Sequence, residues 1–409
     1  MRTYVRKQQQ AKRKALNQTT RQLQPEQILG ELLPSMRQDI ESFAAELGLV
    51  VMERMIEEEI RQKLGAWGQQ PAHRHGSQPG YVCFGGRKVP FQRPRVRNLQ
   101  KEEVSLSSYR AFQTQGKLQE AVARKMMRQC STRDYQGAIE GCLKGYGISR
   151  SSVSRHWKAA TARELKALME RPVPPEVLVL MIDSKFFAGD CLAVALGIDS
   201  QGKKHVLGLW HGATENSTVV SGLLQDLVSR GLDDQQKMLI VIDGAKALRK
   251  AVRMVLGDRA VVQRCRIHKL RNVLDYLPRE KQAQARRRLT MAWGQKDPDS
   301  AEKQLRSAAR WLQKCWPMAA NSLLEGLEET LTVQRLNLPA KLSRALSNTN
   351  IIENCFSGVA YRTHRVKNWQ DPQMVMRWAA NCLLWAEQRF RRFNGCEQLR
   401  LLEKSLRQN

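Results

Sequence analysis

Two stretches decide the fold: EVLVLMIDSKFF at residues 176–187 and KMLIVIDGAKAL at residues 237–248. Each contains a short run of Val, Ile, Leu and Met that is apolar on both faces, which predicts a buried central strand. The first run leads to Asp183 and the second leads to Asp243. A buried carboxylate is costly unless it is paired, hydrogen-bonded or bound to a metal. We therefore expect the two aspartates to meet at the edge of one sheet.

The segments around these strands predict the rest of the sheet. Prolines at 172, 174 and 175 mark a domain boundary before the first strand. Two further apolar runs follow, separated by tight turns at Gly189-Asp190 and at 200–202, which predicts an antiparallel meander. Helices and strands then alternate as far as a helix near His268. This order is typical of an RNase H-like sheet, so we expect a mixed α/β fold.

The C-terminal half is predicted to be largely helical. Residues 277–338 carry no strand signal and predict an α-helical insertion. In SNTNIIENCFSGVAYRTHRVKNW (347–369), we expect Ser347 or Asn348 to cap a helix with Glu353 in its first turns. The expected regions are a basic arm and helical region (1–70), a basic extended segment (71–115), a helix-turn-helix region (116–172), a catalytic core (173–276), the insertion (277–345) and the C-terminal part of the core (346–409).

Charge and composition restrict the class of partner. Lys and Arg number 68 against 39 Asp and Glu, a formal net charge of +29. Such an excess predicts a polyanionic partner, with nucleic acid first and an anionic membrane second. A membrane partner is not expected, because the chain has no run of eighteen apolar residues, and the basic N-terminus lacks the apolar segment of a secretory signal. Nine scattered cysteines without a CxxC pair favour a reducing cytoplasmic setting.

The N-terminal half offers a helix and a basic extended segment. Apolar residues at helical spacing predict a helix within residues 25–65, and its part from 35 to 64 is a candidate interface between copies. The following CFGGRKVPFQRPRVRNLQ alternates apolar and basic residues. Two interpretations are open, a basic β-ribbon against a DNA backbone and an ordinary charged edge strand. The basic residues concerned are Arg87, Lys88, Arg93, Arg95 and Arg97.

A helix-turn-helix is predicted between residues 133 and 165. Its first helix would span 133–143, and its turn would contain Gly145 and Gly147. Ile148 and Val153 are expected to face inward. Arg150 and Arg155 would then lie on an exposed recognition helix rich in hydrogen-bond donors. A plain helical hairpin is the alternative.

Two strand-borne aspartates and a helix-borne glutamate form the minimal set for binding two Mg²⁺ or Mn²⁺ ions. Hard cations favour carboxylate oxygens, and two ions clamp the attacking and leaving oxygens of a phosphoryl displacement. Asp183, Asp243 and Glu353 are therefore candidate catalytic and metal-binding residues. From spacing alone, the three glutamates of the insertion compete with Glu353 for the third position; they are Glu325, Glu328 and Glu329.

Cys265 and His268 form a CxxH pair just after the predicted strand AVVQRC. A zinc site needs four ligands, and only the distant His73, His75 and Cys83 offer partners. We favour a packing role for Cys265. For His268 we expect that it orients a carboxylate or contacts phosphate.

Several ordered motifs carry a family resemblance: IDSKFF, VIDGAKAL, CRIH and NIIENCFSGVAYRTHRVKN, with GGRKVPFQRPRVR upstream. The chain resembles the Mutator-type family of bacterial insertion-sequence transposases, which are DDE enzymes. The resemblance implies an RNase H-like catalytic domain with an α-helical insertion. It also implies that Asp183, Asp243 and Glu353 form the metal-binding triad. Cys265 and His268 then correspond to the family's C-x2-H signature.

The function implied by this resemblance is DNA transposition. Such an enzyme binds double-stranded DNA at terminal inverted repeats, cleaves at the ends of the element and joins the freed 3′-hydroxyl to target DNA. The setting is the bacterial cytoplasm, in association with the nucleoid, and a homo-oligomer on paired ends is expected. The sequence departs from the family pattern at Ser184, where Gly or Ala is frequent, and at Ala360, where Lys or Arg is usual. Arg362, Arg365 or Lys367 would take over that DNA contact.

Two other functions remain open at this point. One is a catalytically silent DNA-binding protein derived from a transposase, whose mark would be a lost carboxylate. The other is a structure-specific nuclease with the same type of sheet, which would cut junctions without preference for repeat ends. All three carboxylates are present, which favours the active enzyme.

Overall fold

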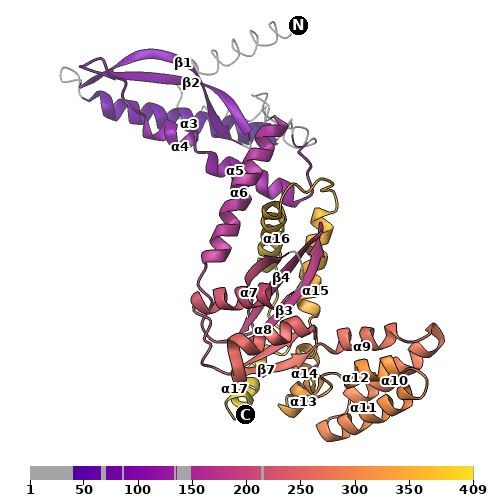
Figure 1. Cartoon of the computed structure of the whole chain (residues 1–409). Helices are drawn as coiled ribbons and strands as arrows, with labels where there is room; N and C mark the ends of the chain where they lie inside the picture. The colour runs from indigo at the N-terminus through magenta and orange to yellow at the C-terminus, as the bar shows by residue number, and fades with distance from the viewer. Residues whose placement is uncertain are drawn as a thin grey trace. The chain divides into compact units, whose positions relative to one another are not determined.

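The computed structural model describes residues 40–65, 71–84, 87–132, 135, 149–212 and 216–408 (Figure 1). The chain divides into two compact units, residues 1–160 and 161–409. The described residues combine α-helices with two β-sheets, which confirms the mixed α/β class. Among the helices described, none has the length and apolarity needed to cross a bilayer.

The first unit is built around a two-stranded antiparallel ribbon. The ribbon pairs Ala72 with Asn98 and Phe84 with Arg87, with one irregularity between Arg74 and Ser77. Its apolar residues share a core with the long helix that precedes it. The elements are α3 (Ile40–Leu64), β1 (Ala72–Phe84), β2 (Arg87–Asn98), α4 (Ser107–Phe112), α5 (Gln115–Met127) and α6 (Arg150–Glu170), within which the unit boundary falls.

Helix α3 does not bury the stripe that the sequence pattern indicates. Leu47, Val51 and Met55 recur at a spacing of four, yet all three are exposed. The core contact is made instead by Ile56 and Ile60, which are fully buried against the ribbon. The helix carries apolar residues on two faces, and only the face toward the ribbon finds a partner within the described part of this unit.

The second unit contains a five-stranded sheet in the order β5-β4-β3-β6-β7. The first three strands in sequence pair antiparallel, whereas β6 runs parallel to both β3 and β7. The predicted meander and the two later strands are therefore confirmed. The strands are β3 (Val177–Phe187), β4 (Asp190–Asp199), β5 (Lys204–Gly212), β6 (Met238–Ile242) and β7 (Ala260–Arg264).

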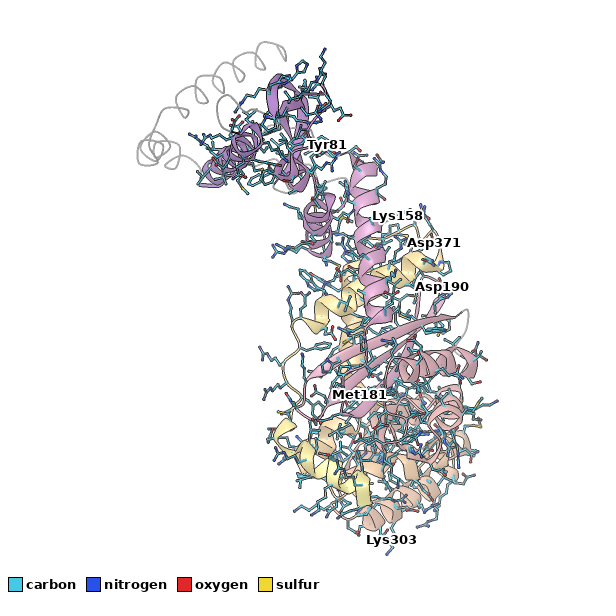
Figure 2. All side chains as sticks on the ribbon, turned by 90° about the vertical axis from the view of Figure 1, so that its left-hand side faces the viewer. Tyr81, Lys158, Met181, Asp190, Lys303 and Asp371 are labelled. Carbon is cyan, nitrogen blue, oxygen red and sulfur yellow. The ribbon has the colours of Figure 1, made fainter. Side chains whose placement is uncertain are left out.

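Helices cover both faces of this sheet (Figure 1). Leu180 and Ile182 of β3 lie in one apolar core with α7 and α8. On the opposite face, the ring of Phe187 lies 6.0 Å from that of Phe356 on α15. Met181, labelled in Figure 2, is fully buried at the centre of the sheet. Burial on both faces explains why the strands are continuously apolar.

The remaining elements include a separate helical layer. Helices α9 to α12 share their own apolar core; α10 to α12 fall within the predicted insertion, and α9 immediately precedes it (Figure 1). The helices are α7 (Ser217–Ser229), α8 (Lys246–Leu256), α9 (Arg266–Asp275), α10 (Arg279–Trp293), α11 (Pro298–Gln313), α12 (Pro317–Leu324), α13 (Thr332–Arg335), α14 (Ala340–Leu346), α15 (Asn350–Thr363), α16 (Pro372–Glu387) and α17 (Leu399–Gln408), with 3-10 turns η2 (Gly257–Arg259), η3 (Glu328–Thr330) and η4 (Cys396–Gln398).

A carboxylate of α3 holds the start of α4. Glu59 accepts hydrogen bonds from the backbone N–H and the hydroxyl groups of both Ser107 and Ser108. Burial raises the pKa of Glu59, but these hydrogen bonds outweigh it and lower the pKa to about 2. The stabilisation is therefore fully present above the ordinary pKa of 4.5 and is lost as the pH falls toward 2.

We predict that Glu59→Gln lowers the stability of the first unit by about 1–2 kcal/mol at pH 7, because a charged acceptor is replaced by a weaker one. Hydrogen exchange of residues 107–112 would then become about tenfold faster or more. Glu58→Gln is the matched control, since Glu58 pairs only with the exposed Arg61. Equal exchange in the two variants would show that the Glu59 contacts contribute nothing.

Candidate active site

The two strand-borne aspartates lie side by side at one edge of the sheet. Ile182 of β3 pairs with Ile242 of the parallel strand β6, so the next residues, Asp183 and Asp243, stand at the same level. Asp183 is only 4 % exposed and accepts a hydrogen bond from the Ser184 N–H at 2.9 Å. Asp243 accepts one from the Ala245 N–H at 2.8 Å. The structure thus brings these two carboxylates together, as the strand pattern predicts.

This arrangement is electrostatically unfavourable without a cation. Burial raises the pKa of Asp183 to about 7, and the neighbouring charge of Asp243 adds to the increase. Glu353 raises it further, whereas His268 lowers it. A carboxylate with such neighbours is expected either to take up a proton or to bind a positive charge. The site is therefore suited to a hard divalent cation.

Cys265 and His268 stand at the end of the third strand in the same row. Arg264 of β7 pairs with Ile242, and the N–H of the following Cys265 donates to the Ile242 carbonyl at 2.7 Å. Helix α9 begins directly after this residue and places His268 in its first turn. The CxxH pair is thus positioned by the strand end that neighbours Asp243.

His268 contacts the helix-borne carboxylate. Its Nε2 lies 3.4 Å from Oε1 of Glu353. A hydrogen bond with Cys265 and the charges of Asp183 and Asp243 outweigh burial and raise the pKa of His268 to about 9. The imidazole is therefore positively charged at neutral pH. Of the two roles considered for His268, the geometry favours orienting a carboxylate.

Glu353 reaches this edge from the first turn of α15 and has a second partner that the sequence analysis missed. Arg271 places its two terminal nitrogens 3.5 and 3.4 Å from the two carboxylate oxygens. Arg271 follows His268 by three residues on α9, and this spacing puts both side chains on one helix face. This three-residue spacing is the sequence feature from which Arg271 could have been predicted as a neighbour of His268. Across the described ranges, no three Asp, Glu, His or Cys side chains are grouped closely enough to hold one ion, and this includes Asp183, Asp243 and Glu353 as they stand.

The cap of α15 differs from the prediction. The capping position belongs to Thr349, not to Ser347 or Asn348. The Thr349 hydroxyl makes no capping bond and instead donates to Sγ of Cys265 at 3.5 Å. Ser347 donates to the carbonyl of Arg344. The Oδ1 of Asn348 accepts a hydrogen bond from the N–H of Asn350, the first residue of α15, at 3.1 Å. The start of this helix is therefore held both by this local bond and by the Thr349 contact with the neighbouring strand end.

The competing glutamates are engaged within and around the insertion. Glu329 forms ion pairs with Arg264, at 3.3 Å, and with Arg249. Glu328 lies 3.9 Å from both Arg306 and Arg335. Glu325 accepts a hydrogen bond from Arg264 through its backbone carbonyl at 3.1 Å. Of these glutamates, Glu353 is the one whose charge acts on Asp183.

The side chain of Arg264 packs between the insertion and the turn that carries Asp243. The side chain is buried between two glycines with positive φ, Gly244 at +105° and Gly326 at +60°. A Cβ at Gly244 would lie 2.8 Å from Cδ of Arg264, and one at Gly326 would lie 2.6 Å from its Cζ. Both glycines are therefore required by close approach as well as by conformation.

The basic residues of the ribbon are partly neutralised by their own unit. Arg93 and Arg95 both form ion pairs with Glu103. The ammonium group of Lys88 lies 4.1 Å above the ring of Tyr81. Arg97 is half-buried, and the side chain of Arg87 lies outside the described residues, although its backbone begins β2. Lys88 thus makes a cation–π contact with Tyr81, while Arg93 and Arg95 share the carboxylate of Glu103.

Only the second part of the predicted helix-turn-helix falls on described residues. The predicted first helix, apart from Tyr135, and the turn with Ile148 lie outside the described residues. The Ser149 hydroxyl accepts from the Ser152 N–H at 3.2 Å and so caps α6. Val153 is fully buried, as predicted, while Arg150 and Arg155 are exposed on the first turns of this helix.

The basic residues after Glu353 differ in their surroundings. Ala360 is exposed on α15, two turns beyond Glu353, and offers no charge. Arg362 donates to the carbonyl of Gly358 on its own helix at 3.2 Å. Arg365 and Lys367 are exposed in the segment that follows α15.

Comparison with known proteins places the chain in a family. The family model described as "Transposase, Mutator family" matches residues 19–392. The chain belongs to the Mutator family of transposases. It is 28% identical over 344 residues to the transposase for insertion sequence element ISRM5 of Rhizobium meliloti (strain 1021), covering 80% of this chain and 83% of that protein. It is 31% identical over 200 residues to that of IST2 from Acidithiobacillus ferrooxidans, covering 49% and 66%.

A third relative extends the comparison across distant bacteria. The chain is 25% identical over 349 residues to the transposase for insertion sequence element IS905 of Lactococcus lactis subsp. lactis (strain IL1403), covering 81% of this chain and 85% of that protein. Membership of this family implies an enzyme that cuts and joins DNA. Transposases bind DNA, and this family generally uses divalent metal ions.

We predict that Gly244→Ala lowers the stability of this family member by about 2 kcal/mol or more, because strain at positive φ and a clash with Arg264 add together. Gly231→Ala is the matched control, since Gly231 has a φ of +99° and no atom lies within 4 Å of its added Cβ. Thermal unfolding measures both. Adding Arg264→Ala to Gly244→Ala should recover part of the lost stability, because the clash is removed. If the stability losses of the two substitutions simply add, the close contact between Arg264 and Gly244 is not what makes the glycine necessary.

Proposed function

We propose that this chain is an insertion-sequence transposase that binds terminal inverted repeats and catalyses DNA cleavage and strand transfer. The observation that carries the proposal is the placement of Asp183 and Asp243 at paired parallel strand ends, with Glu353 directed to the same edge. Phosphoryl transfer by metal-dependent enzymes requires such a cluster of carboxylates.

The sheet topology supports an RNase H-like catalytic domain. Three antiparallel strands followed by two parallel strands, in the order β5-β4-β3-β6-β7, agree with the order expected from the sequence. In the sequence, helices α9 to α12 come after the last strand, β7, and before α15, which agrees with a helical insertion in that domain. We assign residues 173–276 and 346–409 to the catalytic core and 277–345 to the insertion.

Asp183, Asp243 and Glu353 would hold two Mg²⁺ or Mn²⁺ ions, which would activate the attacking oxygen and stabilise the leaving 3′-oxygen. The donor chemistry of the two aspartates suits this role, because Asp183 is buried beside the like charge of Asp243, while Glu353 lies with His268 and Arg271 in the structure described and would have to turn toward the aspartates to complete the ligand set. His268 and Arg271 hold Glu353 near this edge of the sheet. We regard both as positioning residues.

DNA binding is assigned mainly to the first unit. The exposed Arg150 and Arg155 at the start of α6 support a recognition helix, and the basic ribbon supports contact with the phosphate backbone. Pairing of two DNA ends makes a homo-oligomer part of the proposal. The exposed apolar stripe of α3 is the candidate contact between copies.

The test is end cleavage and strand transfer on labelled DNA that carries the element's own termini. We predict that Asp183→Asn and Glu353→Gln each lower both rates by about a thousandfold or more, since each removes a metal ligand. Asp199→Asn is the control. Asp199 also ends a strand, but it pairs with Val177, about 20 Å along β3 from Asp183.

Three results would contradict the proposal. Strand transfer that survives Asp183→Asn in Mg²⁺ would remove the triad. Tight binding of the ends without any cleavage would favour a catalytically silent DNA-binding protein. Cleavage of junctions without preference for the termini would favour a structure-specific nuclease.

A further inference from the structure

The insertion presents a cluster of arginines that the proposed chemistry does not use. Helix α10 buries Ala285 and Leu289 in the core of the insertion. Its outer side carries Arg279, Arg286 and Arg287, all exposed. Glu280 is the acidic residue in this helix, so the outer side has a strong positive excess. We call these three arginines the α10 arginine face.

The α10 arginine face is distinguished by its lack of partners. In the neighbouring helix α11, Glu302 pairs with both Arg306 and Arg335. Considering only residues that the structure describes, none of the three face arginines forms an ion pair or hydrogen bond through its side chain. Arginines that contribute to folding are usually paired or stacked, as Arg288 is above the ring of Trp311 at 4.5 Å. The three are therefore available to an external anion.

The surface between these arginines is hollowed. A hollow of about 580 Å³ is lined by the three arginines together with Ala283, Gln282 and Thr290. The small side chain of Ala283 leaves space between Arg279 and Arg287, which lie two turns apart on the helix. These two arginines are separated by about 12 Å along the helix, a length over which a DNA duplex carries about seven phosphate charges.

The polar groups of the hollow favour phosphate contact over base reading. The side-chain amide of Gln282 donates to the backbone carbonyls of Leu274 and Leu277, at 3.2 Å each, and this anchors α10 to α9. Its N–H groups are thus already used within the protein. Phosphate contacts position a duplex without reading its sequence.

We propose that the α10 arginine face binds the backbone of target DNA. This inference rests on the proposed function and adds a second DNA surface to it. Terminal repeats must be recognised by sequence, whereas a face of unpaired arginines suits DNA that is accepted with little regard to sequence. The same polypeptide segment links this face to the active site, since α9 carries His268 in its first turn and leads directly into α10.

The experiment compares two triple variants of the full chain that lose the same charge. Arg279→Gln with Arg286→Gln and Arg287→Gln removes the face. Lys303→Gln with Arg310→Gln and Lys314→Gln removes three exposed charges from α11 and its C-terminal cap; Lys303 lies at the outer surface of the insertion (Figure 2). Strand transfer into a plasmid, cleavage of labelled ends and binding to an unrelated duplex are measured for each.

We expect the face variant to lower strand transfer about tenfold or more while end cleavage stays within about twofold. For the unrelated duplex in EDTA, the slope of log K against log salt should become shallower by about 2.7, the value for three lost phosphate contacts. The α11 variant should change each quantity far less. Replacing the three face arginines by lysine should retain most of the binding, because the charge is kept.

Three outcomes would overturn the inference. Equal losses in both triple variants would mean that only net charge matters. Equal loss of end cleavage and strand transfer would place terminal DNA on the face. An unchanged salt slope would mean that no duplex binds there. If the native protein fails to cut its ends, the proposed function fails, but the duplex measurement in EDTA still decides the role of the face.

Discussion

The constraint on which the candidate site depends is the placement of two carboxylates at the same level of neighbouring parallel strands, Asp183 within β3 and Asp243 just after β6. Asp183 is buried, and Asp243 stands at the same level on the next strand, so both charges occupy one edge of an otherwise apolar sheet. Folding alone gains nothing from this placement, because a buried like-charge pair is costly. A cation offsets that cost, and so does the protonated His268 nearby. The Asp183–Asp243 pair therefore lowers the stability of the folded chain when no positive charge is bound, which suits a ligand-binding role.

The third carboxylate shows how a distant segment is brought to this edge. Glu353 follows Asp243 by a long helical insertion, yet α15 packs on β3 and carries it back. Two contacts fix the return: Thr349 meets Cys265 at the strand end, and Arg264 fills the space between Gly244 and Gly326. The insertion is therefore part of the architecture of the site, since its own Gly326 packs on the residue that supports the Asp243 turn.

The sequence predicts those features that depend on local pattern. Apolar runs located the strands, and the position of each aspartate within its run located the sheet edge. The sequence does not predict which of several similar neighbouring residues makes a given tertiary contact. Three adjacent polar residues precede α15, and each makes a different contact: Thr349 donates to Cys265, Asn348 accepts from Asn350, and Ser347 donates to Arg344.

Tertiary packing also decides between alternatives on the helices. Helix α3 has two apolar faces, and the ribbon selects the one with Ile56 and Ile60. Two of the glutamates that compete with Glu353 form ion pairs with arginines remote in sequence, Glu329 with Arg264 and Glu328 with Arg306.

The most direct test of the account is cleavage of the protein by Fe²⁺ substituted for Mg²⁺, since hydroxyl radicals formed at a bound iron cut the nearby backbone. The account predicts cuts near residues 183, 243 and 353 that Mg²⁺ suppresses and Asp183→Asn abolishes. Cuts confined to other segments, or unaffected by that substitution, would contradict it.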